Sequence, residues 1–196
     1  MPSGRFEPRA HSDVLQLIAE YPLALLVSQD FQVSALPLIV DEASQDGVRS
    51  LLGHIAKRNP QLPALRERPR ALALFNGPQG YVSGRMVSKP GWGPTWNYAI
   101  VRFEVDIEFC ESGTDDAVRR LAAHLERDAK PAWQVEQMGE RYAQLREHII
   151  GFRAHVRGAQ ARFKLGQDED ASTFAEIVAG FQGMALADWM AGQRVD

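Results

Sequence analysis

One stretch of the sequence gathers basic and amide side chains where an apolar run of strand length ends. A histidine, a lysine and an arginine there can donate hydrogen bonds to a phosphate, and two amides add neutral donors. Taken alone, the stretch is most simply a solvated basic strand end, and a phosphate site is the alternative. The side chains concerned are His54, Lys57, Arg58, Asn59 and Gln61.

Two later segments carry side chains suited to a flat ring and to an anion. Trp96 and Tyr98 flank Asn97 directly after a proline and a threonine. Aromatic planes can cover a heterocycle, and an amide can both donate and accept hydrogen bonds. The segment 162–168 holds cations that can close over an anion. Core packing and a solvated charge run are the simpler interpretations of these two segments taken separately.

The spacings typical of metal sites and activated nucleophiles are missing from this sequence. None of the five histidines forms His-x-His or His-x-x-x-His, and Cys110 is the only cysteine. No serine lies in Gly-x-Ser-x-Gly, and no glycine-rich phosphate loop is present. We therefore expect no metal site and no classical dinucleotide fold, and we assign no catalytic residue.

Composition bounds the class of protein. The chain has 196 residues, 45% of them apolar and 24% charged, with a formal net charge of -3. This size and composition predict one globular domain, 1–196. A net negative charge gives little support for direct DNA binding, which relies on clustered cations. The best basic candidate is Arg66, Arg68 and Arg70, but Glu67 interrupts it, and a solvated helix end explains it more simply.

The N-terminal segment has no apolar stretch typical of a secretion signal. No run approaches the roughly 20 apolar residues of a membrane span. We expect no membrane partner and a cytoplasmic location.

Apolar periodicity and turn residues predict the elements that position these side chains. The clearest is an extended strand at 98–109, in which apolar residues alternate with charged ones. Polar loops are expected at 41–47 and 84–95, and Asn76-Gly77-Pro78 is expected to end a strand. Helices are predicted at 13–21, 62–68, from Thr114 onward, at 139–149 and at about 172–191, and strands at 23–28, 33–40, 48–56, 71–75, 98–109 and 152–157. This order indicates an α+β fold, mainly antiparallel, with peripheral helices around a barrel that leaves few free sheet edges.

Four segments together resemble the PaiB family, described as FMN-binding negative transcriptional regulators. The match runs from Pro8 to about Met190, and the Pro-Thr-Trp-Asn-Tyr run is its most specific part. The segments come in the family's order and spacing: 53–61, 75–83, 94–98 and 163–167.

The resemblance implies an FMN-binding split barrel, similar to pyridoxamine-phosphate oxidases, that works as a homodimer with each flavin between two subunits. It places the flavin phosphate near His54, Lys57 and Asn59, and the isoalloxazine ring near Trp96 and Asn97. The segment from Lys164 to Gln167 would reach in from the neighbouring subunit or close the pocket. The implied cofactor-binding residues are His54, Lys57, Asn59, Gln61, Trp96, Asn97, Lys164 and Gln167.

The chain also departs from the family pattern. Ala35, Gln79 and Arg102 stand where the family usually has histidine, and Ser83 to Val87 replaces an aromatic run. These changes leave open whether FMN binding is retained, weakened or absent. Three functions therefore remain: a flavoprotein with a role in negative transcriptional regulation, a small flavin-dependent oxidoreductase, and a divergent barrel dimer that binds another planar ligand.

Overall fold

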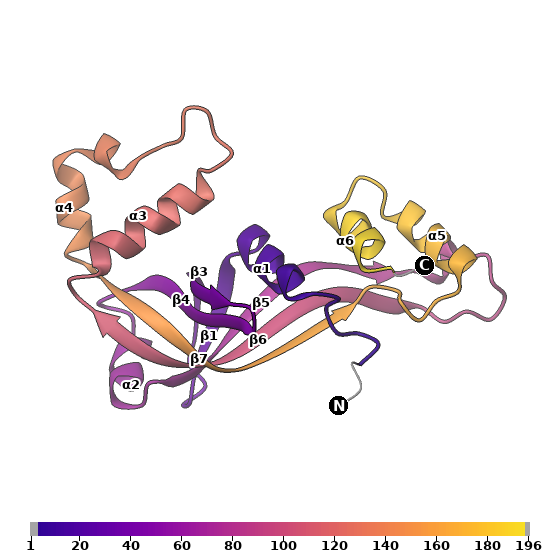
Figure 1. The fold of residues 1–196 in the computed structure, drawn as a ribbon, viewed down its shortest axis with the longest axis horizontal. Helices are drawn as coiled ribbons and strands as arrows, with labels where there is room; N and C mark the ends of the chain where they lie inside the picture. Colours follow the sequence, from indigo (N-terminus) through magenta and orange to yellow (C-terminus); the bar gives the residue numbers. More distant parts are fainter. Residues whose placement is uncertain (1–3, 195–196) are drawn as a thin grey trace.

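The structure, a computed structural model, describes residues 4–194 (Figure 1). Seven strands form one sheet, and six α-helices lie around it. The helices are α1 (His11–Glu20), α2 (Gln61–Glu67), α3 (Thr114–Leu125), α4 (Glu140–Arg146), α5 (Ala171–Gly180) and α6 (Ala185–Gln193). The strands are β1 (Leu23–Ser28), β2 (Val33–Pro37), β3 (Ile39–Ser44), β4 (Gly47–Ala56), β5 (Arg70–Val82), β6 (Thr95–Cys110) and β7 (Ile149–Lys164).

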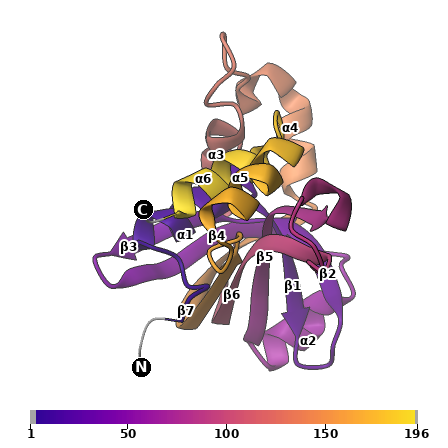
Figure 2. The ribbon, with the colours of Figure 1, turned by 90° about the vertical axis from the view of Figure 1, so that its right-hand side faces the viewer.

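The sheet is antiparallel throughout, and it curls because its two ends are joined. Its strand order is β2-β1-β5-β6-β7-β4-β3, so the outermost strands are consecutive in the chain and meet at Leu38. Leu38 is fully buried, and its N–H donates to the carbonyl of Pro22 at 2.8 Å. A Cβ on Gly53 would lie 2.4 Å from Leu38 Cδ2, so the fold closes tightly at this point. The sheet is therefore the split barrel that the sequence predicts (Figure 2).

Strands β6 and β7 are much longer than an average strand and extend beyond the barrel as an arm (Figure 1). They pair from Tyr98 opposite Lys164 to Cys110 opposite Gly151. The inward side chains of β6 alternate with charged ones, as the sequence predicts, and Phe103 packs edge-on against Phe75 at 6.0 Å between ring centroids. Helices α3 and α4 lie at one end of the arm, and α5 and α6 at the other.

The prediction that Asn76-Gly77-Pro78 ends a strand is wrong. β5 continues to Val82 and pairs with β6 on both sides of a register shift between Asn76 and Gln79. This bulge takes Pro78 into the strand without a ladder hydrogen bond from its nitrogen. The predicted polar loop at 41–47 is likewise mostly strand, because β3 and β4 form a hairpin with a tight turn.

Two predictions near the C-terminus also need correction. The last strand is not 152–157 but the whole of β7, so Arg162 and Lys164 lie within it. The single helix expected at about 172–191 is two helices, α5 and α6. Gly183, between them, has φ of 80°, a conformation that glycine adopts without strain and that no helix continues.

Candidate functional site

The basic stretch of the sequence forms a corner where β4 ends and α2 begins, and we call His54, Lys57, Asn59 and Gln61 the His54 cluster. Lys57 is exposed and forms an ion pair with Glu111 at 3.1 Å. The Asn59 side chain donates to the Ser34 hydroxyl at 3.0 Å and accepts from the Gln61 N–H at 2.9 Å. Asn59 therefore fixes the turn into α2, while the Lys57 ammonium stays accessible.

Gln61 has a structural role in this corner. Its side chain is 1% exposed and donates to the carbonyls of Leu26 and Gln32 at 3.0 and 2.9 Å. These bonds attach α2 to the β1–β2 hairpin. Of the residues that the resemblance implies here, Gln61 is thus the least accessible to a ligand.

His54 contributes an unused polar atom. It is largely buried, and burial lowers the pKa of its imidazole below the usual 6.5, so the ring is neutral at pH 7. Its Nδ1 is buried and has no hydrogen-bond partner among residues 4–194. A buried polar atom without a partner is costly, so this nitrogen suits a ligand that can hydrogen-bond to it.

The second group, which we call the Trp96 cluster, comprises Tyr81, Trp96 and Lys164 at the far end of the arm. Trp96 and Tyr81 are cross-strand neighbours, 48% and 51% exposed, with ring centroids 5.9 Å apart. Lys164 donates to the Thr95 hydroxyl and, at 3.2 Å, to the Trp96 carbonyl. Tyr81 was not among the predicted site residues, because its pairing with Trp96 depends on β5 continuing past Pro78.

Two other residues implied by the resemblance face inward at this end. Asn97 is 1% exposed and donates to the sulfur of Met190 at 3.5 Å, which fixes α6 to the arm. Gln167 donates to the carbonyl of Phe163 and accepts from the N–H of Leu165 at 2.7 Å. Both amides stabilise local structure, and the exposed surface is left to the aromatic pair and Lys164.

One copy of the chain does not bring the His54 and Trp96 clusters together. His54 lies opposite Gly151, which in turn pairs with Cys110, whereas Trp96 lies near the start of the same strand. Cys110 is fourteen positions after Trp96 on β6, which is roughly 45 Å at about 3.3 Å per residue. A single flavin is far shorter than this separation.

The arginines considered for DNA binding are partly neutralised. Arg66 lies 3.8 Å from Glu111 and over the ring of Phe109, and Arg70 lies 3.5 Å from Asp106. Such pairing leaves less free charge for a phosphate backbone.

Across residues 4–194, no three His, Cys, Asp or Glu side chains are placed to share a metal ion. In that same part of the chain, no helix has the length and apolar character that a membrane crossing requires.

Comparison with known proteins connects this geometry to flavin binding. Residues 2–158 match the profile of the protein family described as "Putative FMN-binding domain". An uncharacterized protein of Aspergillus fumigatus is 28% identical over 232 residues, covering 88% of this chain and 89% of that protein. The protease synthase and sporulation protein PAI 2 of Bacillus subtilis is 28% identical over 137 residues, covering 67% and 64% respectively.

Among solved structures, the FAD and heme binding protein of Mycobacterium smegmatis superimposes with a TM-score of 0.60 at 16% identity, covering 88% of this chain and 79% of that one. This likeness concerns the fold. The matched family profile and the Bacillus relative confirm the resemblance drawn from the sequence, and the chain belongs to the FMN-binding domain family.

Proposed function

We propose that the protein is a homodimeric FMN-binding protein in which each cofactor lies between the His54 cluster of one protomer and the Trp96 cluster of its partner. The observation that carries this proposal is the separation of the two clusters along β6. Each cluster offers part of a flavin site, and a two-fold axis, the commonest symmetry of soluble oligomers, can join them.

The His54 cluster suits the phosphate end of FMN. Lys57 and Arg58 are exposed cations, and Lys57 has a solvent-facing partner, Glu111, that a phosphate can replace. The unpartnered Nδ1 of His54 lies in the same corner and can hydrogen-bond to a phosphate or ribityl oxygen. The donor set therefore fits this part of the cofactor.

The Trp96 cluster suits the flavin ring. Trp96 and Tyr81 present exposed aromatic surface at 48% and 51%, and flat heterocycles stack on such faces. Lys164 lies beside them and brings a positive charge to the same spot. Bound FMN supplies redox chemistry, while these side chains hold it and orient its ring.

An apolar surface on β1 and β2 suits a second copy of this chain. On the outer side of the sheet, apolar residues of β1 and β2 remain exposed, with Leu23 at 61% and Val33 at 56%. Phe31 at the hairpin tip is 86% exposed and has φ of 64°, a rare conformation for a bulky residue. Contiguous exposed apolar surface marks an interface. The patch comprises Leu23, Leu25, Val27, Phe31, Val33 and Leu72.

For the regulatory role, we infer that any effect on transcription occurs without a DNA contact by α2. The ion pairs of Arg66 and Arg70 support this. Titration of promoter fragments at low salt should then detect no binding, and binding that weakens steeply with salt would contradict the inference.

The direct test is flavin reconstitution. The purified protein, incubated with excess FMN and desalted, should retain a flavin absorbance spectrum. Lys57→Ala and Trp96→Ala should each weaken FMN binding about tenfold or more, because each removes one end of the site. Lys89→Ala and Trp133→Ala are matched controls, since Lys89 pairs with Asp170 and Trp133 lies in the loop after α3. A protein that stays colourless after reconstitution would contradict the proposal.

Mixing the two variants tests the shared site. In a mixed dimer of Lys57→Ala and Trp96→Ala protomers, one site has both substitutions and the other has neither. Refolding the variants together should therefore restore FMN binding to about a quarter of all sites, whereas either variant alone shows none at the same concentration. Mixed dimers that bind no FMN, or a monomer by light scattering at micromolar concentration, would refute the shared site.

A further inference from the structure

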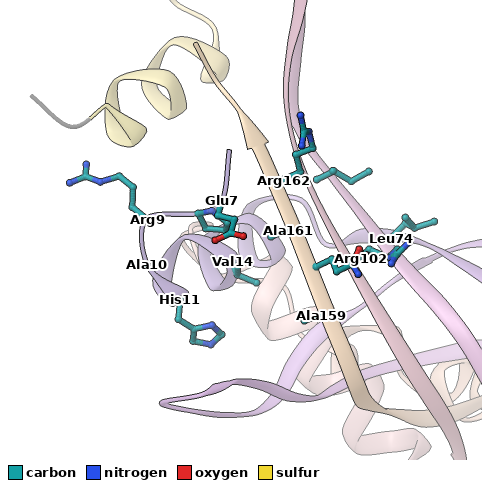
Figure 3. A pocket seen from close by; sticks show the side chains of 13 residues that line it. Glu7, Arg9, Ala10, His11, Val14, Leu74, Arg102, Ala159, Ala161 and Arg162 are labelled. Atoms are coloured by element: carbon teal, nitrogen blue, oxygen red, sulfur yellow. Dashed lines mark hydrogen bonds between the residues drawn. The ribbon is translucent and has the colours of Figure 1, made fainter. Parts of the chain in front are cut away.

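A hollow of about 750 Å³ lies beside β7, next to the Trp96 cluster, because its lining residue Arg162 is two residues before Lys164 on β7 (Figure 3). It is lined by the N-terminal segment 7–11 and α1 on one side and by β5, β6 and β7 on the other. β4 pairs with β7 only as far as His155, so the edge of β7 is open here. Ala159 and Ala161 lie on the face of β7 toward α1, and Gln160 and Arg162 lie on the opposite face, because side chains alternate along a strand. We call this space the β7 hollow.

Two arginines on neighbouring strands face the hollow together. Arg102 lies opposite Gln160, and Arg162 is two residues further along β7, so the two are diagonal neighbours about 7–8 Å apart. Arg102 donates to the Gln160 side chain at 2.6 Å, and Arg162 donates to the Tyr98 hydroxyl at 3.1 Å. The Arg162 guanidinium also lies over the Phe6 ring, 4.9 Å from its centre. Both groups are therefore held in place by neutral partners.

Neither guanidinium is neutralised. Within residues 4–194, the ion pairs of this sheet include neither Arg102 nor Arg162. Glu7 is the one carboxylate among the described residues that line the hollow, and it lies on the opposite side of β7 from Arg102 (Figure 3). Leu74 and Ile100 add an apolar surface next to the two cations.

The same sheet also holds arginines with a purely structural role. Arg157, at a bulge in β7, and Arg70 both contact Asp106, at 2.7 and 3.5 Å. Asp106 neutralises these two arginines, so they need no anionic ligand. Arg102 of β6 and Arg162 of β7 are the same kind of cation in the same sheet but have no acid between them, which is the arrangement that binds a carboxylate or phosphate in a bidentate manner.

We propose that Arg102 and Arg162, with Gln160, bind the phosphate or carboxylate group of a small molecule whose apolar part lies on Leu74 and Ile100. The site takes one class of ligand, an anion attached to an apolar or aromatic body. Its side chains belong to neither the His54 cluster nor the Trp96 cluster, although Arg162 lies two residues before Lys164 on the same strand.

The test titrates the flavin-free protein with inorganic phosphate and, separately, with benzoate, at constant ionic strength, by calorimetry. Arg102→Gln and Arg162→Gln should each raise the apparent Kd by roughly tenfold, because each removes one of two charged donors. Arg157→Gln is the matched control: it removes the same charge from the same strand and should change the Kd by less than about twofold. Far-ultraviolet circular dichroism checks that every variant is folded.

A second comparison identifies the source of the anion. If the pair holds the phosphate of FMN, Arg162→Gln reduces the preference for FMN over riboflavin; if that preference is unchanged while benzoate binding is lost, the anion belongs to another ligand. Both results support the site. Unchanged phosphate and benzoate binding in both variants, or an equal loss in Arg157→Gln, would overturn it. Loss of flavin binding at Lys57→Ala or Trp96→Ala bears only on the proposed function.

Discussion

Two groups of arginines around this sheet differ in the charge of their hydrogen-bond partners. Arg120 of α3 and Arg153 of β7 converge on Asp41, whose side chain is 5% exposed, at 2.5 and 2.8 Å. Ser50 adds a hydroxyl donor at 3.3 Å. The pair in the β7 hollow has only amide, phenol and aromatic partners. The first group attaches α3 to β3 and β7 of the barrel. The second group leaves its charge without an acidic partner.

Structural and binding arginines differ in the charge of their partners. A buried carboxylate between two guanidiniums pairs with both of them. Removing one partner leaves an unpaired charge in a poorly solvated place. Removing a guanidinium that has only neutral partners costs the fold little stability, because no unpaired charge is left behind. Substituting a structural arginine should therefore change the free energy of unfolding, and substituting a binding arginine should change the Kd for the ligand.

The largest effect is expected at Asp41. Asp41→Ala should lower the free energy of unfolding by about 2–3 kcal/mol, at the low end for a broken buried pair because Arg120 and Arg153 keep some solvent contact. Urea denaturation followed by tryptophan fluorescence, at one protein concentration, measures it. Asp46→Ala, an exposed carboxylate in the adjacent turn, should change stability by less than about 0.5 kcal/mol. Equal losses in the two variants would contradict a stabilising role for the ion pairs of Asp41 with Arg120 and Arg153.

The ion pairs of Asp41 also predict that the free energy of unfolding depends on pH. Burial acts to raise the pKa of Asp41, but hydrogen bonds from Arg120 and Arg153 outweigh it and hold the pKa below its ordinary value of 3.8. The resulting stability is present above the unfolded-state pKa and is lost as the pH falls through the folded-state pKa. The stability gap between wild type and Asp41→Asn should therefore narrow as the pH falls from about 6 to about 3. A gap that stays constant or widens would show that ionised Asp41 is not the stabilising form.

Matched arginine substitutions give a smaller, sharper contrast. Arg153→Gln should cost about 1–2 kcal/mol of unfolding free energy, because Asp41 keeps Arg120 but loses a charged hydrogen bond. Arg102→Gln should cost less than about 0.5 kcal/mol, as expected for a residue paired only with Gln160. Thermal unfolding of the two variants beside wild type decides this. If Arg102→Gln were the more damaging change, its role would be structural.

Much of the fold can be read from the sequence, and the misses have a common cause. The alternation in β6 is correct because one face of that strand is uniformly buried. The error at Gly77 and Pro78 arose because local turn signals were overridden by packing. A Cβ on Gly77 would lie 2.9 Å from the Leu17 side chain, so the glycine serves the approach of α1 rather than a turn.

The candidate site was only partly predictable for a related reason. Lys57 and Trp96 are exposed as the sequence suggests, whereas Asn97 and Gln61 face the interior. The alternation of β6, continued two residues back from Ala99, places Asn97 on the buried face, whereas the burial of Gln61 depends on packing that no local pattern encodes. The pairing of Arg102 with Gln160 depends on the register of β6 against β7, which are far apart in the chain. No motif in the sequence marked that pair.

A small change in stability of the opposite sign is expected when a carboxylate is placed beside Arg102. Gln160→Glu replaces the amide that accepts from Arg102 with a carboxylate in the same position. Because the pair is close to solvent, the gain in unfolding free energy should be at most about 0.5–1 kcal/mol. The same change should reduce phosphate and benzoate binding by roughly tenfold, since the new carboxylate competes for the guanidinium. Calorimetric titration and thermal unfolding on one preparation measure both effects. Gln160→Asn is the neutral control, and it should not raise stability. Anion binding that persists in Gln160→Glu would mean that Arg102 does not hold the anion, and the two groups of arginines would then not differ in ligand binding.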